Sequence, residues 1–166
     1  MLFLDHLTQG RPLTILPVLC SSFESWCEQG SPSQVSRIES FIAALRGAIA
    51  GAGRPVVVIG GVDLSHVGPR FGDAEAVGPP LAAAARAGDL ASLDRVAAGD
   101  AEGFWAAVMA DGNRRRVCGL SATYTVLRVL APVRGCVVDY GQGEDPGGGI
   151  VGFAACVLDG EHPGDG

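Results

Sequence analysis

The feature that most constrains the fold is the run RPVVVIGG at residues 54–61. It is a short, continuous stretch of β-branched residues bounded by glycines, which is typical of a central strand buried on both faces of a sheet. The run therefore predicts a strand in a partly parallel sheet. The loop GGVDLSHVG at residues 60–68 then follows the carboxyl end of that strand, where open α/β sheets bind their ligands.

The segments before this run predict a strand and a helix. Residues 13–20 (LTILPVLC) resemble a strand, and Pro17 favours an edge or a strand end because it lacks a backbone donor. Residues 31–34 (SPSQ) combine a capping serine, a proline and a glutamine, which is the pattern of a capping box at a helix start. Apolar residues at helical spacing follow, and Gly51 is a natural stop.

The second half of the chain predicts further helices and a pair of strands. The alanine-rich residues 73–112 favour two or three helices with Asp89 and Asp100 as N-caps, and residues 118–130 favour another. Two strands are expected at residues 135–140 and 150–158. The glycine-rich turn between them, residues 141–149, is long enough either to be mobile or to cover a site. We expect one α/β domain over residues 1–158, with a mixed, partly parallel sheet flanked by helices, and a flexible tail at 159–166.

Composition excludes several classes of function. The net charge is −6 without a basic stripe, which disfavours nucleic acid as a partner. All 12 basic residues are arginine, so Schiff-base and phosphate-loop lysine chemistry are excluded. The five cysteines never show the C-x-x-C spacing, which indicates reduced thiols. No leader or membrane span is recognisable, so we expect a cytoplasmic protein that makes no membrane contact.

The loop after the predicted central strand carries the first candidate site. If the chain turns helically there, Asp63 and His66 fall on one face at i and i+3, and the carboxylate can orient the imidazole for acid–base work. The alternative is that Asp63 only caps the turn and His66 is an ordinary loop histidine. Asp63, Ser65 and His66 are too close in sequence to converge as a serine hydrolase triad, and the G-x-S-x-G motif is absent.

Cys118 is the second candidate, because it opens a predicted helix and follows three arginines at positions 114–116. The helix N-terminus and the arginines both favour a thiolate, which could bind a metal or act as a nucleophile paired with His66. The alternative is a small residue that packs the start of the helix. The arginines could bind an anionic substrate or form a solvated corner, and Arg70 is the better candidate for anion binding.

Four segments resemble the Memo-like family, the B component of the AmmeMemoRadiSam system. They are VVVIGGVDLSHVGPRFGD (56–73), GDAEGFWAAV (99–108), VCGLSATYTVL (117–127) and VVDYGQ…GIVGFAACVL (137–158). They occur in the family's order and cover nearly the whole chain, and the Asp-Leu-Ser-His…Arg-Phe-Gly piece is the most specific.

The resemblance implies a fold similar to class III extradiol dioxygenases, with a metal site of two histidines and a cysteine. In this sequence Cys118 matches the metal-binding cysteine and His66 the catalytic-type histidine beside it, with Asp63 as its companion. We place Ser65, Arg70 and Tyr140 on the substrate side. The family implies iron or copper as cofactor and components of a radical-SAM system as partners.

This chain lacks the region that carries both metal histidines in the family. The resemblance therefore implies an N-terminally truncated domain with an incomplete metal site, and exposed apolar surface that favours a homo-oligomer. Three hypotheses follow: a metal-dependent redox protein, a non-catalytic module that binds a small molecule, peptide or partner protein, and a metal-independent enzyme that uses Cys118 and His66.

Overall fold

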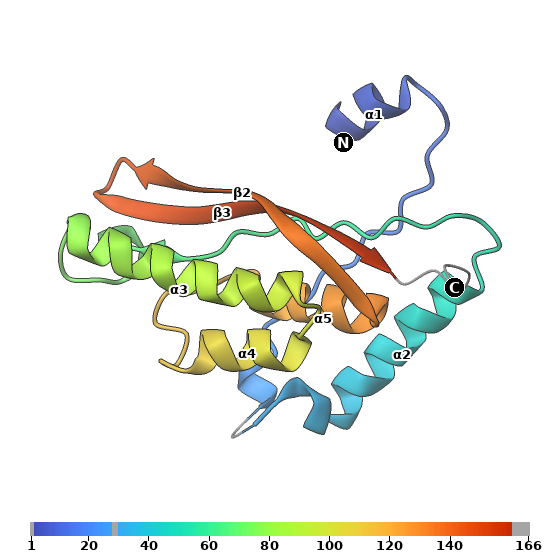
Figure 1. Ribbon diagram of the computed structural model, residues 1–166, viewed down its shortest axis with the longest axis horizontal. Helices are drawn as coiled ribbons and strands as arrows, with labels where there is room; N and C mark the ends of the chain where they lie inside the picture. The colour runs from blue at the N-terminus through green and yellow to red at the C-terminus, as the bar shows by residue number, and fades with distance from the viewer. Residues whose placement is uncertain (1, 28–29, 161–166) are drawn as a thin grey trace.

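A computed structural model describes residues 2–27 and 30–160 of the chain. Its sheet is built on a long hairpin of β2 (Val133–Asp145) and β3 (Gly149–Gly160), with a β-bulge between Val137 and Asp139. The two-residue strand β1 (His66–Val67) pairs with the other edge of β3, so the strand order is β1-β3-β2. The hairpin crosses the molecule above every helix except the N-terminal one (Figure 1).

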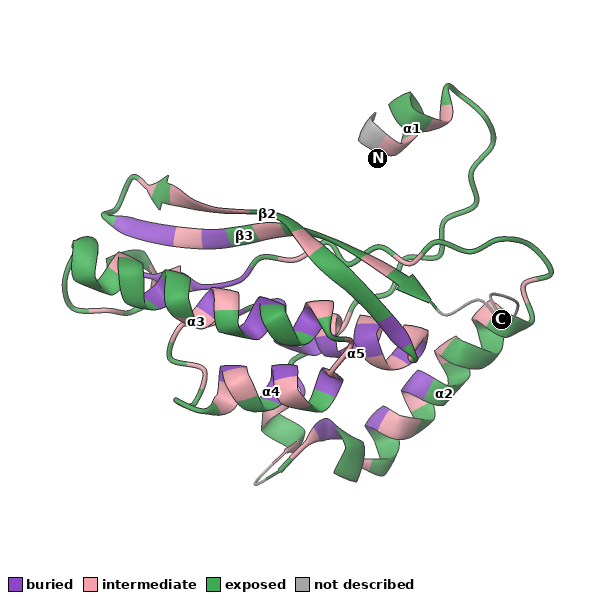
Figure 2. Ribbon diagram, in the orientation of Figure 1, coloured by how far each residue is buried: buried purple, intermediate pink, exposed green. Residues whose placement is uncertain are grey.

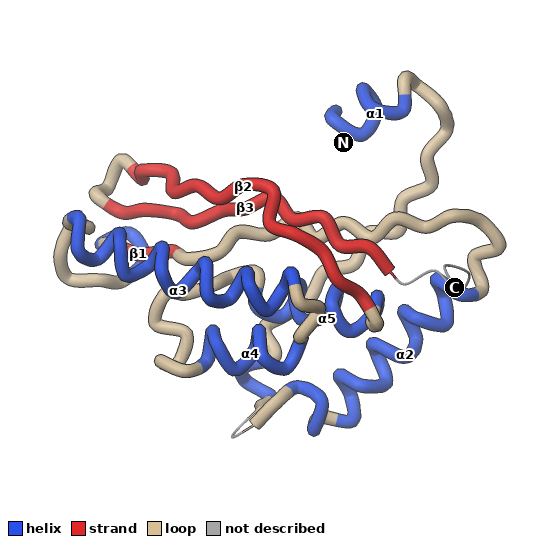
Figure 3. The backbone as a smooth tube through the Cα atoms, viewed as in Figure 1, coloured by secondary structure: helices blue, strands red, loops and turns tan. Residues whose placement is uncertain are grey.

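All the helices except the N-terminal one lie beneath the hairpin in the tube view, and the N-terminal helix stands apart from them (Figure 3). α3 packs against β2, β3 and α4, and α5 packs against α4 and α2. Three short 3-10 turns, η1, η2 and η3, connect these elements. The bounds are α1 (Leu2–Thr8), η1 (Glu24–Trp26), η2 (Pro32–Gln34), α2 (Ser36–Ala50), η3 (Pro69–Phe71), α3 (Pro79–Ala97), α4 (Ala101–Met109) and α5 (Leu120–Leu130).

The main core lies where α2, α4 and α5 meet. The rings of Phe104 and Tyr124 are fully buried there, together with Ile38, Leu120 and Leu127. Buried positions recur on the inward faces of α3 and α4, whose outer faces carry exposed residues, whereas every residue of α5 is buried or half-buried (Figure 2). The one-sided burial of α3 and α4 is what the helical spacing of apolar residues predicts. A smaller cluster beneath the other end of the hairpin is formed by Val67, Ala85 and Ile150.

The predicted caps at Ser31 and Asp100 are confirmed. Ser31 and Gln34 form the expected capping box, but it caps the 3-10 turn η2, and α2 begins only at Ser36. Asp100 is the N-cap of α4, where its carboxylate accepts a hydrogen bond from the Gly103 amide at 2.8 Å. Gly51 is the C-cap of α2, as predicted.

Asp89 is not a cap, and this prediction was wrong. α3 runs without interruption from Pro79 to Ala97, so Asp89 lies in its middle, where it is fully buried. The hairpin turn is also shorter than predicted, because β2 continues to Asp145 and β3 starts at Gly149. Helix α5 starts at Leu120, two residues after Cys118.

The strands predicted at residues 13–20 and 54–61 do not form. Both segments are extended, but within the described ranges neither makes a backbone–backbone hydrogen bond. Val57 and Leu19 are 83% and 99% exposed, so the central-strand prediction for residues 54–61 was wrong. β-Branched residues favour extended backbone, but a strand also requires a neighbour. The predicted combination of a sheet with helices is confirmed, but the sheet is not partly parallel: both of its pairings are antiparallel, and no parallel pairing occurs among the described residues.

The mixed α/β class expected from the sequence is therefore confirmed, with the hairpin as its centre in place of residues 54–61. Among residues 2–27 and 30–160, no helix is both long enough and apolar enough to cross a membrane.

Candidate functional site

Three of the predicted side chains come together beside β1. One donor atom from each of Asp63, His66 and Cys118 lies within 4.8 Å of the other two. His66 Nε2 and Asp63 Oδ2 are 3.9 Å apart. Asp63 and Cys118 are exposed, whereas the side chain of His66 is only 18% exposed. A thiol, an imidazole and a carboxylate therefore share one small, solvent-facing corner.

The contact between this loop and the start of α5 depends on Gly119. Its amide donates to the Asp63 carbonyl at 3.1 Å, and the Cys118 thiol contacts the same oxygen at 3.7 Å. A Cβ at position 119 would lie 2.7 Å from the Asp63 carbonyl and 2.8 Å from the Val62 side chain. Glycine after the cysteine is what allows the two segments to approach.

The orientation of the His66 ring follows from its hydrogen bonds. Nδ1 lies 3.1 Å from the Leu64 carbonyl and 3.2 Å from the Arg116 carbonyl, and the Phe71 ring meets the imidazole edge-on. A carbonyl can only accept, so Nδ1 carries the proton and the lone pair is on Nε2. The same nitrogen faces Asp63. A histidine held this way is suited to bind a metal through Nε2 or to accept a proton there.

Comparison with known proteins shows the family of the chain. The sequence model of a family described as Memo-like protein matches residues 2–157, which include every member of the cluster. The chain belongs to the Memo-like family. A curated relative, a MEMO1 family protein of Thermus thermophilus, is 39% identical over 84 residues, which are 51% of this chain and 25% of the relative. The matched segment thus spans only a quarter of that relative. No solved structure matches the chain.

Ser65 is turned away from the cluster in this Memo-like chain. It is fully buried, and its hydroxyl donates to Asp89 Oδ2 at 2.6 Å. The Tyr140 hydroxyl donates to the same oxygen at 3.0 Å. Burial, followed by the nearby Asp89 carboxylate, raises the pKa of Tyr140, which keeps the phenol protonated. Two residues that we placed on the substrate side are thus engaged with a buried carboxylate.

Arg70 also has a partner of its own. Its guanidinium pairs with Asp145 at 2.8 Å and ties η3 to the tip of the hairpin, although the arginine side chain remains 71% exposed. The structure therefore joins Asp63, His66 and Cys118 but does not add Ser65, Arg70 or Tyr140 to them.

The sequence left Arg115 and Arg116 as either an anion-binding group or a solvated corner, whereas the structure pairs both of them with aspartates. Arg115 pairs with Asp89 and also donates to Ser92 at 3.2 Å. Arg116 pairs with Asp73 at 2.8 Å. Only Arg114 is an exposed corner residue. Two of the three arginines pair with acidic residues that are far away in the sequence, and only the fold shows which acidic residues these are.

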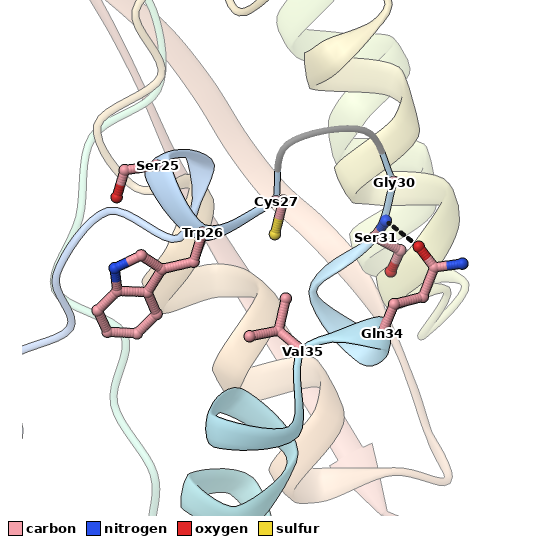
Figure 4. Close-up of a pocket in the computed structure, with 7 residues that line it drawn as sticks. All are labelled: Ser25, Trp26, Cys27, Gly30, Ser31, Gln34 and Val35. Carbon is pink, nitrogen blue, oxygen red and sulfur yellow. Dashed lines mark hydrogen bonds between the residues drawn. The ribbon is translucent and has the colours of Figure 1, made fainter.

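Two hollows lie away from the cluster. A shallow one of about 340 Å³ contains none of the predicted site residues and is lined by Ser25, Trp26, Cys27, Gly30, Ser31, Gln34 and Val35 (Figure 4). An apolar one of about 170 Å³ lies between the extended segment after Val58, helix α5 and strand β3. Cys156 lines the second hollow, and burial raises the pKa of its thiol. Neither hollow offers the donors found beside β1.

Acid is expected to weaken the loop around His66 through Asp73. Hydrogen bonds from the Arg116 guanidinium, and then from the Gly68 amide, hold the pKa of Asp73 below its ordinary value. The stability from such a carboxylate is present above its unfolded pKa of about 3.9 and is lost as the pH falls through the folded pKa. The difference in melting temperature between wild type and Asp73→Asn should therefore shrink in acid. Equal differences at neutral pH and at about pH 3 would contradict this.

Proposed function

We propose that this Memo-like protein binds one transition-metal ion through Cys118, His66 and Asp63 and takes part in metal-dependent redox chemistry. The observation that carries the proposal is the His66 ring. Two carbonyls hold its Nδ1–H, so the free lone pair is on Nε2, which faces the Asp63 carboxylate, and Cys118 belongs to the same cluster. Metal-binding histidines typically donate their other ring N–H to a carbonyl in the same way.

The donor set fits a metal of intermediate softness. Metal–ligand bonds of 2.0–2.3 Å place tetrahedral ligands roughly 3.5 Å apart. The separation of His66 and Asp63 is 3.9 Å and the widest in the cluster is at most 4.8 Å, so closure requires only side-chain adjustment. Thiolate with imidazole favours copper, iron or zinc over magnesium or calcium. Three protein ligands also leave an open position, as catalytic sites do.

The family resemblance supports iron or copper, and either ion would supply one-electron redox chemistry when bound. The chain's own residues would provide the rest of the site. The Cys118 thiolate is the charged, soft anchor, and Asp63 adds a second negative charge at the exposed edge. Here His66 serves as a ligand in place of the acid–base role that the sequence predicted. The wider role, as the B component of an AmmeMemoRadiSam system, rests on family membership.

Metal titration of the purified protein tests this proposal. With Co²⁺ under reducing conditions, wild type should bind one ion per chain and show a thiolate-to-cobalt absorption band. Cys118→Ser should abolish the band, and His66→Ala and Asp63→Asn should each weaken binding about tenfold or more. Cys136→Ser is the matched control, because Cys136 is also an exposed cysteine but lies on β2.

Two outcomes would overturn the proposal. Wild type that binds no Co²⁺, iron or copper would leave the non-catalytic binding module as the better hypothesis. Metal binding that is unchanged in Cys118→Ser would place the ion elsewhere. If metal is absent and the Cys118 thiol titrates well below an ordinary cysteine, the metal-independent Cys118–His66 enzyme becomes the better account.

A further inference from the structure

The turn before Cys118 has an unusual backbone. Asn113 and Arg116 both adopt positive φ values, +55° and +52°, in the left-handed region. Asparagine tolerates this region, and its side-chain oxygen accepts the Val117 amide at 2.8 Å, so the conformation of Asn113 is explained locally. Arg116 has one local side-chain bond, to the Arg114 carbonyl at 3.2 Å, and its other side-chain partners are remote in the sequence. Residues other than glycine keep this conformation where the surrounding structure requires it, often at functional sites.

The left-handed turn lets Arg116 contact His66 in two ways. Its carbonyl is directed at His66 Nδ1, 3.2 Å away, and its guanidinium donates to the His66 carbonyl at 3.3 Å. The guanidinium also forms a bidentate pair with Asp73, at 2.8 and 3.1 Å. Asp73 in turn accepts the Gly68 amide at 2.7 Å. Arg116 thus contacts both the ring and the backbone of His66, and through Asp73 it also stabilises the loop that follows His66.

The Leu64 carbonyl, which is the other acceptor for Nδ1, cannot by itself fix the position of the His66 ring. The Leu64 carbonyl lies two residues before His66 in the same loop, so it moves with the histidine and does not fix the ring relative to α5. Arg116 comes from the segment that leads to Cys118, and the neighbouring Arg115 carbonyl accepts the His66 amide at 2.6 Å. The contacts from Arg115 and Arg116 therefore fix the position of the imidazole relative to the Cys118 thiol.

We propose that Arg116 is a positioning residue that holds His66 as the Nδ1–H tautomer and so directs the Nε2 lone pair toward Asp63 and Cys118. The functional meaning of this inference rests on the proposed metal site. The tautomer itself is a property of the metal-free protein. It can therefore be tested even if no metal binds.

The experiment is ¹⁵N NMR of the His66 ring in metal-free protein at alkaline pH, where the ring is neutral, followed by Zn²⁺ titration. Wild type should show a single Nδ1–H tautomer. Arg116→Ala keeps the backbone carbonyl that accepts from Nδ1 but loses the guanidinium pair with Asp73 that holds this carbonyl in place. It should therefore show exchange between both tautomers and bind Zn²⁺ about tenfold more weakly. Arg116→Lys keeps the charge but loses the bidentate geometry, so it should fall between them. Arg114→Ala, an exposed neighbour, should match wild type.

Asp73→Asn provides a second variant in case Arg116→Ala does not fold, and it should shift the tautomer ratio in the same direction by a smaller amount. The inference is overturned if wild type carries its proton on Nε2. It is also overturned if Arg116→Ala keeps the pure Nδ1–H tautomer and wild-type Zn²⁺ affinity while melting at a lower temperature, since that result would show a merely structural role. If wild type binds no Zn²⁺, the proposed metal site fails, and the tautomer measurement alone decides this inference.

Discussion

Replacing Asp89 with alanine should lower the free energy of unfolding by about 3–5 kcal/mol, because it leaves a buried guanidinium without its counter-ion. Asp89 is fully buried within α3, and its carboxylate accepts from Ser65, Arg115 and Tyr140. The Arg115 side chain is only 11% exposed and cannot turn to water without leaving its site. Each of the two hydroxyls would also lose its acceptor. Urea denaturation followed by circular dichroism measures the change.

The matched control for this prediction is Asp94→Ala. Asp94 lies on the same helix, five residues further on, but is exposed, so its removal should change the free energy of unfolding by no more than about 0.5 kcal/mol. The double variant Asp89→Leu with Arg115→Met removes both charges and should be less destabilised than Asp89→Ala. If Asp89→Ala is as stable as Asp94→Ala, the buried pair of Asp89 and Arg115 contributes nothing to the free energy of unfolding.

Asp89 also shows where sequence reasoning fails. An aspartate in an alanine-rich segment predicts an N-cap, because capping is a local effect that can be read from neighbouring residues. The same reasoning succeeds at Asp100, where the partner, the Gly103 amide, is three residues away. The partners of Asp89 are 24, 26 and 51 residues away. Only the fold brings them together, and no local pattern distinguishes the two aspartates.

The strand predictions for residues 13–20 and 54–61 failed for a related reason. The β-branched residues of the segment 54–61 set its extended backbone, but pairing depends on other strands, and a neighbouring strand is missing from the described residues. The hairpin was predictable because its two strands are adjacent in sequence and supply each other's partners. Thus elements with local partners could be predicted, and those with remote partners could not.

In the candidate site, too, some residues could be predicted from the sequence and others could not. Asp63 and His66 are three residues apart, and the family motif connected them to Cys118, which the structure places beside them. Arg116 could not be assigned, because its guanidinium partner Asp73 and its contacts with His66 lie 43 and 50 residues away. Residue type and spacing identified the donors, whereas their orientation depends on contacts that only the fold supplies.

Replacing Gly68 with alanine should destabilise the protein by about 3 kcal/mol and detach the His66 loop from the hairpin. Gly68 adopts φ +123° and ψ 178°, a region that is essentially restricted to glycine. An added Cβ would also collide with the backbone of Gly149, with only 3.1 Å to its nitrogen. Because backbone atoms cannot rotate away, the loop must shift. β1, which pairs His66 with Val151 and Val67 with Ile150, would lose its register.

The effect should therefore appear in both stability and the site. For a chain of this size, a loss of about 3 kcal/mol corresponds to a fall in melting temperature of roughly 6–12 °C. Co²⁺ binding should weaken as well, because β1 carries His66. Gly61→Ala is the control, since Gly61 has open space around its Cβ position and an ordinary φ, and it should melt close to wild type. If Gly68→Ala and Gly61→Ala melt at the same temperature and bind Co²⁺ equally, the close contact between the loop and the hairpin does not position His66.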